Sequence, residues 1–204
     1  MTSTWDDDRH AFTDAATWVV ALSRQVGDRW DRPGLGEWDV RALVGHTGRA
    51  LLTVETYLGR PAATVAVSST AAYYRAAREL VGGSEVTERG REAGRALGPD
   101  PAAAVAEVVA RVLPLVAGCD GAELVTTVVG GMRLADYLPT RVFELAVHGA
   151  DLAAALDLPL DVPPTAAASA LRLVADLAVA DGRAGTLLRA VTGRTGLPGG
   201  YSVL

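Results

Sequence analysis

Three residue types are missing from this sequence of 204 residues: it contains no lysine, no asparagine and no isoleucine. All 19 of its basic residues are therefore arginine. The codons for the three missing residues are rich in A and T, so their absence indicates a gene from a high-GC genome. The lack of lysine reflects the source of the gene and is not interpreted as thermal adaptation.

Cysteine is almost absent as well. The single thiol, Cys119, excludes a disulfide within the chain, and we expect a cytoplasmic protein. Its setting between Gly118 and Asp120 is typical of a turn after a helix, so we do not expect a catalytic cysteine. The sequence also lacks an uncharged apolar run of about 18 residues and a basic, then apolar, N-terminus. Neither a membrane span nor a signal peptide is expected.

No basic stripe is present, and the formal net charge is -5, so we do not expect nucleic-acid binding. Aromatic residues are scarce, at 5%, although half of all residues are hydrophobic. Alanine dominates that half, and alanine favours helices that approach one another closely. We expect one domain, covering residues 1–204.

Apolar residues spaced three and four apart predict a mostly helical fold. The expected helices cover 6–27, 39–58, 69–81, a weak and solvated 84–97, one beginning at Asp100-Pro101, 135–156, 163–181 and 184–192. Asp39 and Asp100 have the positions of N-caps. Pro139 should lie in the first turn of its helix or mark an irregular start. β-branched residues around Gly130-Gly131 predict a small hairpin within 123–133.

The helix predicted at 135–156 carries the most informative pattern. Arg141, Glu144, His148 and Asp151 follow one another at helical spacing, which puts them on one face. The residues around them are apolar, so this helix should be largely buried. A buried charge is costly unless it is paired or holds a metal ion.

Glu144 and His148 are one turn apart, so a carboxylate oxygen and an imidazole nitrogen can converge on one cation. Of the other two histidines, His10 lies in a charged N-terminal stretch, which leaves His46 as the third ligand. Two imidazoles and a carboxylate suit Zn²⁺, with Ni²⁺, Fe²⁺ and Co²⁺ as alternatives, and they leave a coordination position open. Asp151 or Glu55 is expected to orient a ligating imidazole.

Simpler interpretations remain open at this stage. A glutamate and a histidine four residues apart on a helix often form only a hydrogen-bonded pair. The polar face would then be an ion-pair network in a structural bundle that holds no metal.

Two motifs resemble a known family. The segment Asp39–His46 resembles the helix-two motif of DinB-like proteins and, more closely, the metal-binding domain of mycothiol-dependent maleylpyruvate isomerase. The segment Arg141–Leu152 resembles the second metal motif of that domain. The ending, 188–194 and 197–204, is similar to shorter relatives. The resemblance implies an up-down four-helix bundle, here with a small β-hairpin and short extra helices, and His46, Glu144 and His148 as metal ligands.

The family's isomerase has an additional C-terminal domain, for which we expect no room in this chain. The resemblance therefore implies the broader activity, thiol-dependent transfer or isomerisation, rather than maleylpyruvate isomerisation itself. Mycothiol is a thiol of high-GC actinobacteria, which agrees with the composition.

The first functional hypothesis is an enzyme, in which the sulfur of a small thiol takes the open metal position and attacks a small electrophile. Arg141 and Arg49 are candidate catalytic residues, and Arg133 is a candidate for binding the thiol cofactor, because guanidinium groups bind carboxylates. The alternative is a metal-dependent bundle that binds a small molecule or serves regulation without turnover. Assembly into a homodimer is left open.

Overall fold

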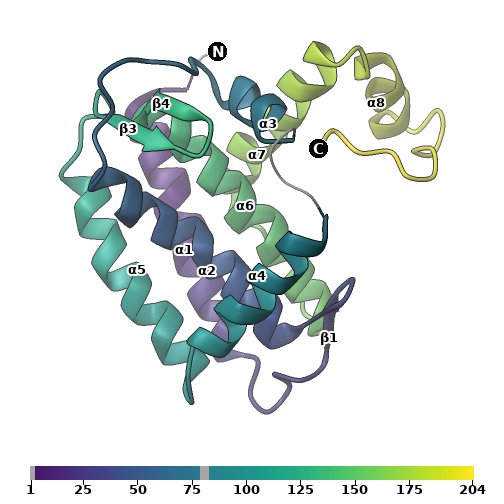
Figure 1. Ribbon diagram of the computed structural model, residues 1–204. Coiled ribbons are helices and arrows are strands. Elements are labelled where there is room, and N and C mark those ends of the chain that lie inside the picture. The colour runs from purple at the N-terminus through teal and green to yellow at the C-terminus, as the bar shows by residue number, and fades with distance from the viewer. Residues whose placement is uncertain (1–2, 79–82) are drawn as a thin grey trace.

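The computed structural model describes residues 3–78 and 83–204, and within them the chain is mostly helical (Figure 1). Four long helices form a bundle: α1 (Trp5–Arg24), α2 (Val40–Leu58), α5 (Pro101–Ala117) and α6 (Leu134–Ala155). A hairpin of β3 (Leu124–Thr127) and β4 (Gly130–Arg133) connects α5 to α6. The predicted helical bundle with a small hairpin is confirmed.

The hairpin marks one end of the bundle. The indole Nε1 of Trp5, at the start of α1, donates to the carbonyl of Cys119 just beyond α5 at 3.0 Å. The amide of Ala62, after the end of α2, donates to the carbonyl of Leu124 at 2.9 Å. Helices α1 and α6 therefore begin at this end and α2 and α5 finish there, so α1 and α6 run opposite to α2 and α5.

The apolar faces of the four helices meet in one core. Phe12, Leu43, Leu51, Leu138 and Leu145 are completely buried there. These residues come from the periodic apolar stripes of α1, α2 and α6, so the same pattern that forms each helix also determines which face is buried. The core fixes the position of α2 relative to α6, and therefore also the relative position of the side chains on these two helices.

Two further helices lie between α2 and α5 in the chain: α3 (Thr70–Arg78) and α4 (Gly83–Ala96). The part of the predicted 69–81 helix that covers 79–81 lies outside the described residues. The expectation of a weak, solvated helix at 84–97 was wrong, because α4 packs against α2. A Cβ atom on Gly45 would lie 2.2 Å from the backbone nitrogen of Gly94, so the backbones of α2 and α4 touch.

Most of the other predicted boundaries hold to within a few residues. Asp39 and Asp100 accept hydrogen bonds from the amides of Ala42 and Ala103 at 2.7 and 3.0 Å, which confirms both N-caps. Helix α1 ends three residues before the predicted Gly27.

The short strands β1 (Pro33–Leu35) and β2 (Trp38–Asp39) were not predicted, because their proline and glycine indicated a loop.

Helix α7 (Pro164–Ala180) packs on α6 and α1, and α8 (Ala184–Val191) follows it. Pro139 lies inside α6, beyond its first turn, rather than at an irregular start. In the described part of the chain, no helix combines the length and apolar character that crossing a membrane requires.

Candidate metal centre

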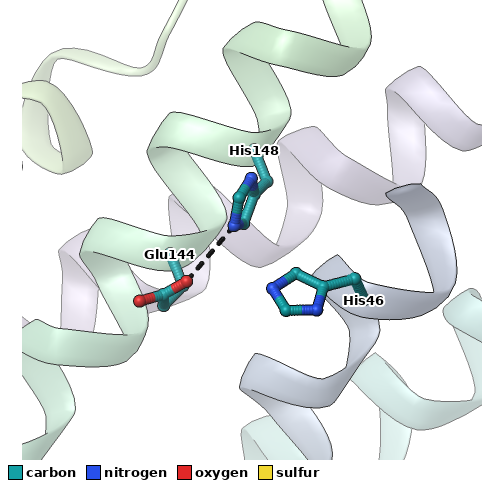
Figure 2. Close-up of side chains that lie close together, drawn as sticks. All are labelled: His46, Glu144 and His148. Carbon is teal, nitrogen blue, oxygen red and sulfur yellow. Dashed lines mark ion pairs between the residues drawn. The ribbon is translucent and has the colours of Figure 1, made fainter. Parts of the chain in front are cut away.

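The polar face of α6 is half-buried against α2. Glu144 and His148 lie one turn apart, and their side chains are 22% and 15% exposed. Oε2 of Glu144 lies 3.3 Å from Nε2 of His148. Figure 2 shows these two side chains pointing towards each other, with the His46 imidazole approaching them from the facing helix. The sequence pattern therefore brought the two polar groups to the interior, as expected.

His46 completes the group from α2. One potential ligand atom from each of His46, Glu144 and His148 lies within 4.8 Å of the other two. The imidazole of His46 packs 4.4 Å from the Trp38 ring and 4.9 Å from the His148 ring, measured between centroids. Its Nδ1 is buried and has no hydrogen-bond partner in the described part of the chain.

Two further side chains orient the pair on α6. The hydroxyl of Tyr74, on α3, donates to Oε1 of Glu144 at 2.6 Å, which leaves Oε2 facing His148. On the other side, Nδ1 of His148 lies 3.1 Å from Oδ2 of Asp151. Such a contact fixes the tautomer of the imidazole and directs Nε2 to the interior.

Of the two residues proposed as orienting groups, Asp151 has this position and Glu55 does not. Glu55 instead forms an ion pair with Arg111 of α5 at 3.2 Å. Tyr74 was not predicted as a partner of Glu144. It belongs to another helix, and no spacing in the sequence connects residues 74 and 144. The only sequence signal was the Tyr73-Tyr74 pair in a short predicted helix.

The pKa values of His46, Glu144 and His148 all differ strongly from those of the free side chains. Burial by itself disfavours the charged form of His148, but hydrogen bonds to Asp151 and Glu144 outweigh it and raise its pKa to about 9. Burial likewise opposes ionisation of Glu144, but the hydrogen bond with His148 and the charge of Arg141 lower its pKa to about 2. Burial and the positive His148 lower the pKa of His46 to about 4. His46 is therefore neutral near pH 7, with a lone pair available.

These residues fit a divalent cation. An ordinary hydrogen-bonded pair would account for Glu144 and His148. It gives no reason for a neutral imidazole, whose Nδ1 has no hydrogen-bond partner among the described residues, to face them from another helix. Two imidazoles and one carboxylate are an established ligand set for Zn²⁺ with a position left open. Within the described residues, no other group of three such side chains is close enough to share an ion.

A cavity of about 510 Å³ opens beside the group and reaches His46 and Glu144. Its wall includes tyrosines, small apolar residues and four arginines: Arg49, Arg78, Arg89 and Arg141. The hairpin turn contributes Val128 to the same wall. The cavity therefore combines a candidate ion site with apolar and cationic surfaces.

Arg141, a predicted site residue, lies inside this cavity. It is 8% exposed, and its guanidinium carbon lies 5.0 and 5.6 Å from the ring centroids of Tyr137 and Tyr73. Its Nε donates to Oγ1 of Thr140 at 2.9 Å. No carboxylate of the described residues pairs with it within 4.0 Å, although its charge stabilises the Glu144 carboxylate from a greater distance, so the guanidinium can still contact a ligand.

The other two predicted arginines are placed differently. Arg49 is half-buried on α2, lines the cavity and forms no ion pair with a described residue. Arg133 is exposed at the end of β4 and does not belong to the cavity wall. Arg78, which does belong to the wall, is paired with Asp181.

The single thiol is remote from this chemistry. Cys119 follows α5, and burial together with nearby Glu123 raises its pKa to about 11. Its Sγ lies 3.3 Å from the carbonyl of Leu115, to which it donates. A thiol with this pKa is mostly protonated near pH 7, so it is a poor nucleophile.

Comparison with known families gives one match. Residues 9–153 match the family described as the mycothiol maleylpyruvate isomerase N-terminal domain. The matched segment runs from α1 to the end of α6 and includes His46, Glu144 and His148. Neither the curated proteins nor the solved structures contain a significant match. Since the family covers well over half of the chain, the protein belongs to the mycothiol maleylpyruvate isomerase N-terminal domain family.

Proposed function

We propose that this protein binds one divalent metal ion through His46, Glu144 and His148 and serves a mycothiol-dependent transfer or isomerisation of a small electrophile. The observation that carries the proposal is the neutral His46 imidazole, which faces a carboxylate and a second imidazole and makes no hydrogen bond with a described residue. Family membership supports the thiol-dependent chemistry.

The donor set favours zinc, with nickel, iron or cobalt as alternatives. Glu144 supplies one negative charge and the imidazoles are neutral, so a divalent ion here keeps a charge of +1 and favours an anionic fourth ligand. A bound ion of this kind lowers the pKa of a coordinated thiol and stabilises the thiolate. The pKa of the Cys119 thiol is too high for this role, and Cys119 does not belong to the cavity wall, so the thiol comes from a small molecule such as mycothiol.

The chain's own residues would hold the reactants. Asp151 and Tyr74 fix the orientation of His148 and Glu144, so that the donors need little rearrangement. Arg141, and beside it Arg49, can bind a carboxylate of the substrate or of the thiol, because both line the cavity and neither pairs with a described carboxylate. The wall also contains the rings of Tyr57, Tyr73 and Tyr74, and charge interactions are stronger beside such low-dielectric surfaces than in water.

The test uses protein in which Co²⁺ replaces the native ion. Addition of mycothiol, or of a simpler thiol, should produce sulfur-to-cobalt charge-transfer absorption in the near ultraviolet. The His46→Ala protein should show none, because it lacks a ligand, and His10→Ala should behave as the native chain does. If Co²⁺ binds normally and no thiol alters its spectrum, the thiol-dependent function is wrong.

Turnover is tested separately, because a metal-dependent binding protein would give the same spectrum. Metal-loaded protein should consume mycothiol or release an isomerised product when it is given a panel of small electrophiles that carry a carboxylate. Binding of thiol without turnover of any electrophile would leave the non-catalytic alternative as the function.

A further inference from the structure

The wall of the cavity beside the candidate metal centre changes in character from its inner end to its mouth. At the inner end, Arg141 and the rings of Tyr73 and Tyr74 are 8%, 7% and 8% exposed. Val128 and Leu204 belong to the same wall, yet they are 58% and 49% exposed, so they lie where the cavity opens to solvent. A buried charge therefore lies at the inner end, and large apolar side chains lie at the mouth.

The apolar side chains near the mouth come from three separate parts of the chain. Val128 lies in the hairpin turn, and Val86 is half-buried on α4. Leu204 follows Val203, which is 8% exposed and whose carbonyl accepts a hydrogen bond from Arg78 of the cavity wall. The segment that carries Leu204 is thus held against the cavity. Single exposed apolar residues are common on proteins, but several that converge on one cavity are typical of a surface that binds an apolar group.

The inner end has no anion close to its buried cation. The Nε of Arg141 donates to Thr140, and the guanidinium lies against the rings of Tyr73 and Tyr137. Glu144, the only carboxylate in the wall, acts on Arg141 from beyond 4.0 Å. Burial of a guanidinium is costly without a close anion. This end of the cavity therefore favours a carboxylate, which a guanidinium binds through two parallel hydrogen bonds.

The size of the cavity suits a ligand larger than a short-chain acid. Its volume of about 510 Å³ lies within the range of about 300–1,000 Å³ that is typical of sites for drug-sized ligands. The uncharged part of the wall is largely apolar and includes Ala50, Ala77 and the ring of Tyr57. A ligand that fills this space must therefore bury mainly hydrocarbon.

We infer that the electrophile on which the proposed function acts is an aliphatic carboxylate of medium chain length. Its carboxylate pairs with Arg141, and its hydrocarbon chain leads to Val128 and Leu204 at the mouth. The inference rests on the proposed function for the reaction, but the binding that it describes uses no metal ligand. A dicarboxylate of the same length is the competing ligand, because Arg78 also lines the cavity. Arg78 is already paired with Asp181, which disfavours a second anion there.

The probe is octanoate, an unreactive acid of this class, titrated calorimetrically into the full chain. Octanoate should bind at one saturable site and at least about tenfold more tightly than butanoate, because four further methylene groups leave water. The alcohol 1-octanol should bind about tenfold more weakly than octanoate, since it lacks the charge-assisted pair with Arg141. Octanedioate should also bind more weakly, because its second carboxylate would lose water against apolar side chains.

Variants at the mouth separate the apolar contact from a structural role. Val128→Asn and Leu204→Asn should each weaken octanoate binding by about threefold and leave butanoate binding unchanged, because only the longer acid reaches them. Arg141→Gln should weaken the binding of both acids about tenfold, since both lose the same charge-assisted pair. The matched control is Val179→Asn, at a valine that is 68% exposed outside the cavity, and it should bind both acids as the native chain does.

Thermal melts establish that each variant is folded. Treatment with a chelator should leave the preference for the longer acid unchanged, so this test gives an answer even if the proposed metal centre is wrong. The inference is overturned if octanoate binds no more tightly than butanoate or if octanedioate binds more tightly than octanoate. It is also overturned if folded Val128→Asn and Leu204→Asn both bind octanoate as the native chain does.

Discussion

At the scale of single residues, the two candidate ligands on α6 are each held from the side that faces away from His46. Tyr74 binds the outer oxygen of Glu144, and Asp151 binds the outer nitrogen of His148. Ligands that are already oriented lose less conformational entropy when an ion binds, so these contacts should contribute to metal affinity.

The contribution of Tyr74 can be measured by Tyr74→Phe, which removes only the hydroxyl. Loss of such an orienting contact typically costs about 10- to 100-fold in metal affinity. The matched control is Tyr57→Phe, in the same cavity wall, because the Tyr57 hydroxyl makes no hydrogen bond with a described residue. A competition titration against a chromophoric chelator gives both affinities. Equal affinities for the two variants would contradict an orienting role for Tyr74.

Metal binding should also depend on pH through His148. Its raised pKa of about 9 means that the imidazole is protonated at pH 7, and a metal ion must displace that proton. Affinity should therefore rise as pH increases, by about tenfold per unit for one displaced proton, and level off near pH 9. His46, with a lowered pKa of about 4, should contribute no proton.

Calorimetric titration at pH 7 in buffers with different ionisation heats counts the protons released. We expect about one proton for each ion bound, which corresponds to the proton on His148. Release of no proton would show that the Glu144–His148 pair is not an ion pair before metal binds.

Residue spacing in the sequence predicted the part of this candidate site that lies on a single helix, α6. Glu144, His148 and Asp151 share a face because the helical period dictates it. His46 followed from the scarcity of histidine in the chain and from the resemblance of the segment that ends with it to a known metal-binding domain. The Tyr74 contact could not be predicted, because it depends on how α3 crosses α6, and that crossing leaves no periodic signal.

At the scale of helices, the close contact between α2 and α4 requires a glycine on α2. A Cβ atom on Gly45 would meet the backbone nitrogen of Gly94 at 2.2 Å, whereas one on Gly48, one turn later, would meet nothing within 4 Å. Of these two glycines of α2, only Gly45 therefore admits a neighbouring helix. Since His46 adjoins Gly45, the α2–α4 contact fixes the backbone that carries it.

These two glycines form a matched pair of substitutions. Gly45→Ala should destabilise the protein by about 2 kcal/mol or more, because two helix backbones must move apart. Gly48→Ala should be neutral or raise stability by up to about 1 kcal/mol, since alanine favours a helix and the space is open. Chemical denaturation measures both changes. A Gly45→Ala protein as stable as the native one would show that α4 does not pack in this way.

Helix α4 was misjudged because its sequence is polar and interrupted by glycine, which is typical of a solvated segment. In the folded chain its glycines are contact points: Gly90 lies under the Trp38 ring and Gly94 under α2. Hydrophobic periodicity detects helices that bury large side chains, and it overlooks helices whose contacts are made at glycines.

At the scale of the whole molecule, the helical periodicity and the turn residues predicted a mostly helical fold and its hairpin, and the family resemblance implied the four-helix bundle. The pairing of the helices was not predictable from periodicity. Helices α3 and α4 follow α2 in the chain and precede α5, and α2 and α5 both end at the hairpin (Figure 1). Only the tertiary contacts reveal this arrangement. The result is a central α6 with one cavity beside its Arg141–Glu144 face and another beside its first turns.

The measurement that tests the account most directly is elemental analysis of the native, His46→Ala and His10→Ala chains, purified without a chelator or a histidine tag. His46 has no hydrogen-bond partner among the described residues, so its removal should leave the fold intact, as circular dichroism would verify. We expect about one divalent ion per chain in the native and His10→Ala proteins and almost none in His46→Ala. A native chain that holds no ion and takes up none on titration, or a His46→Ala chain that binds as well as the native one, would contradict the proposed metal centre.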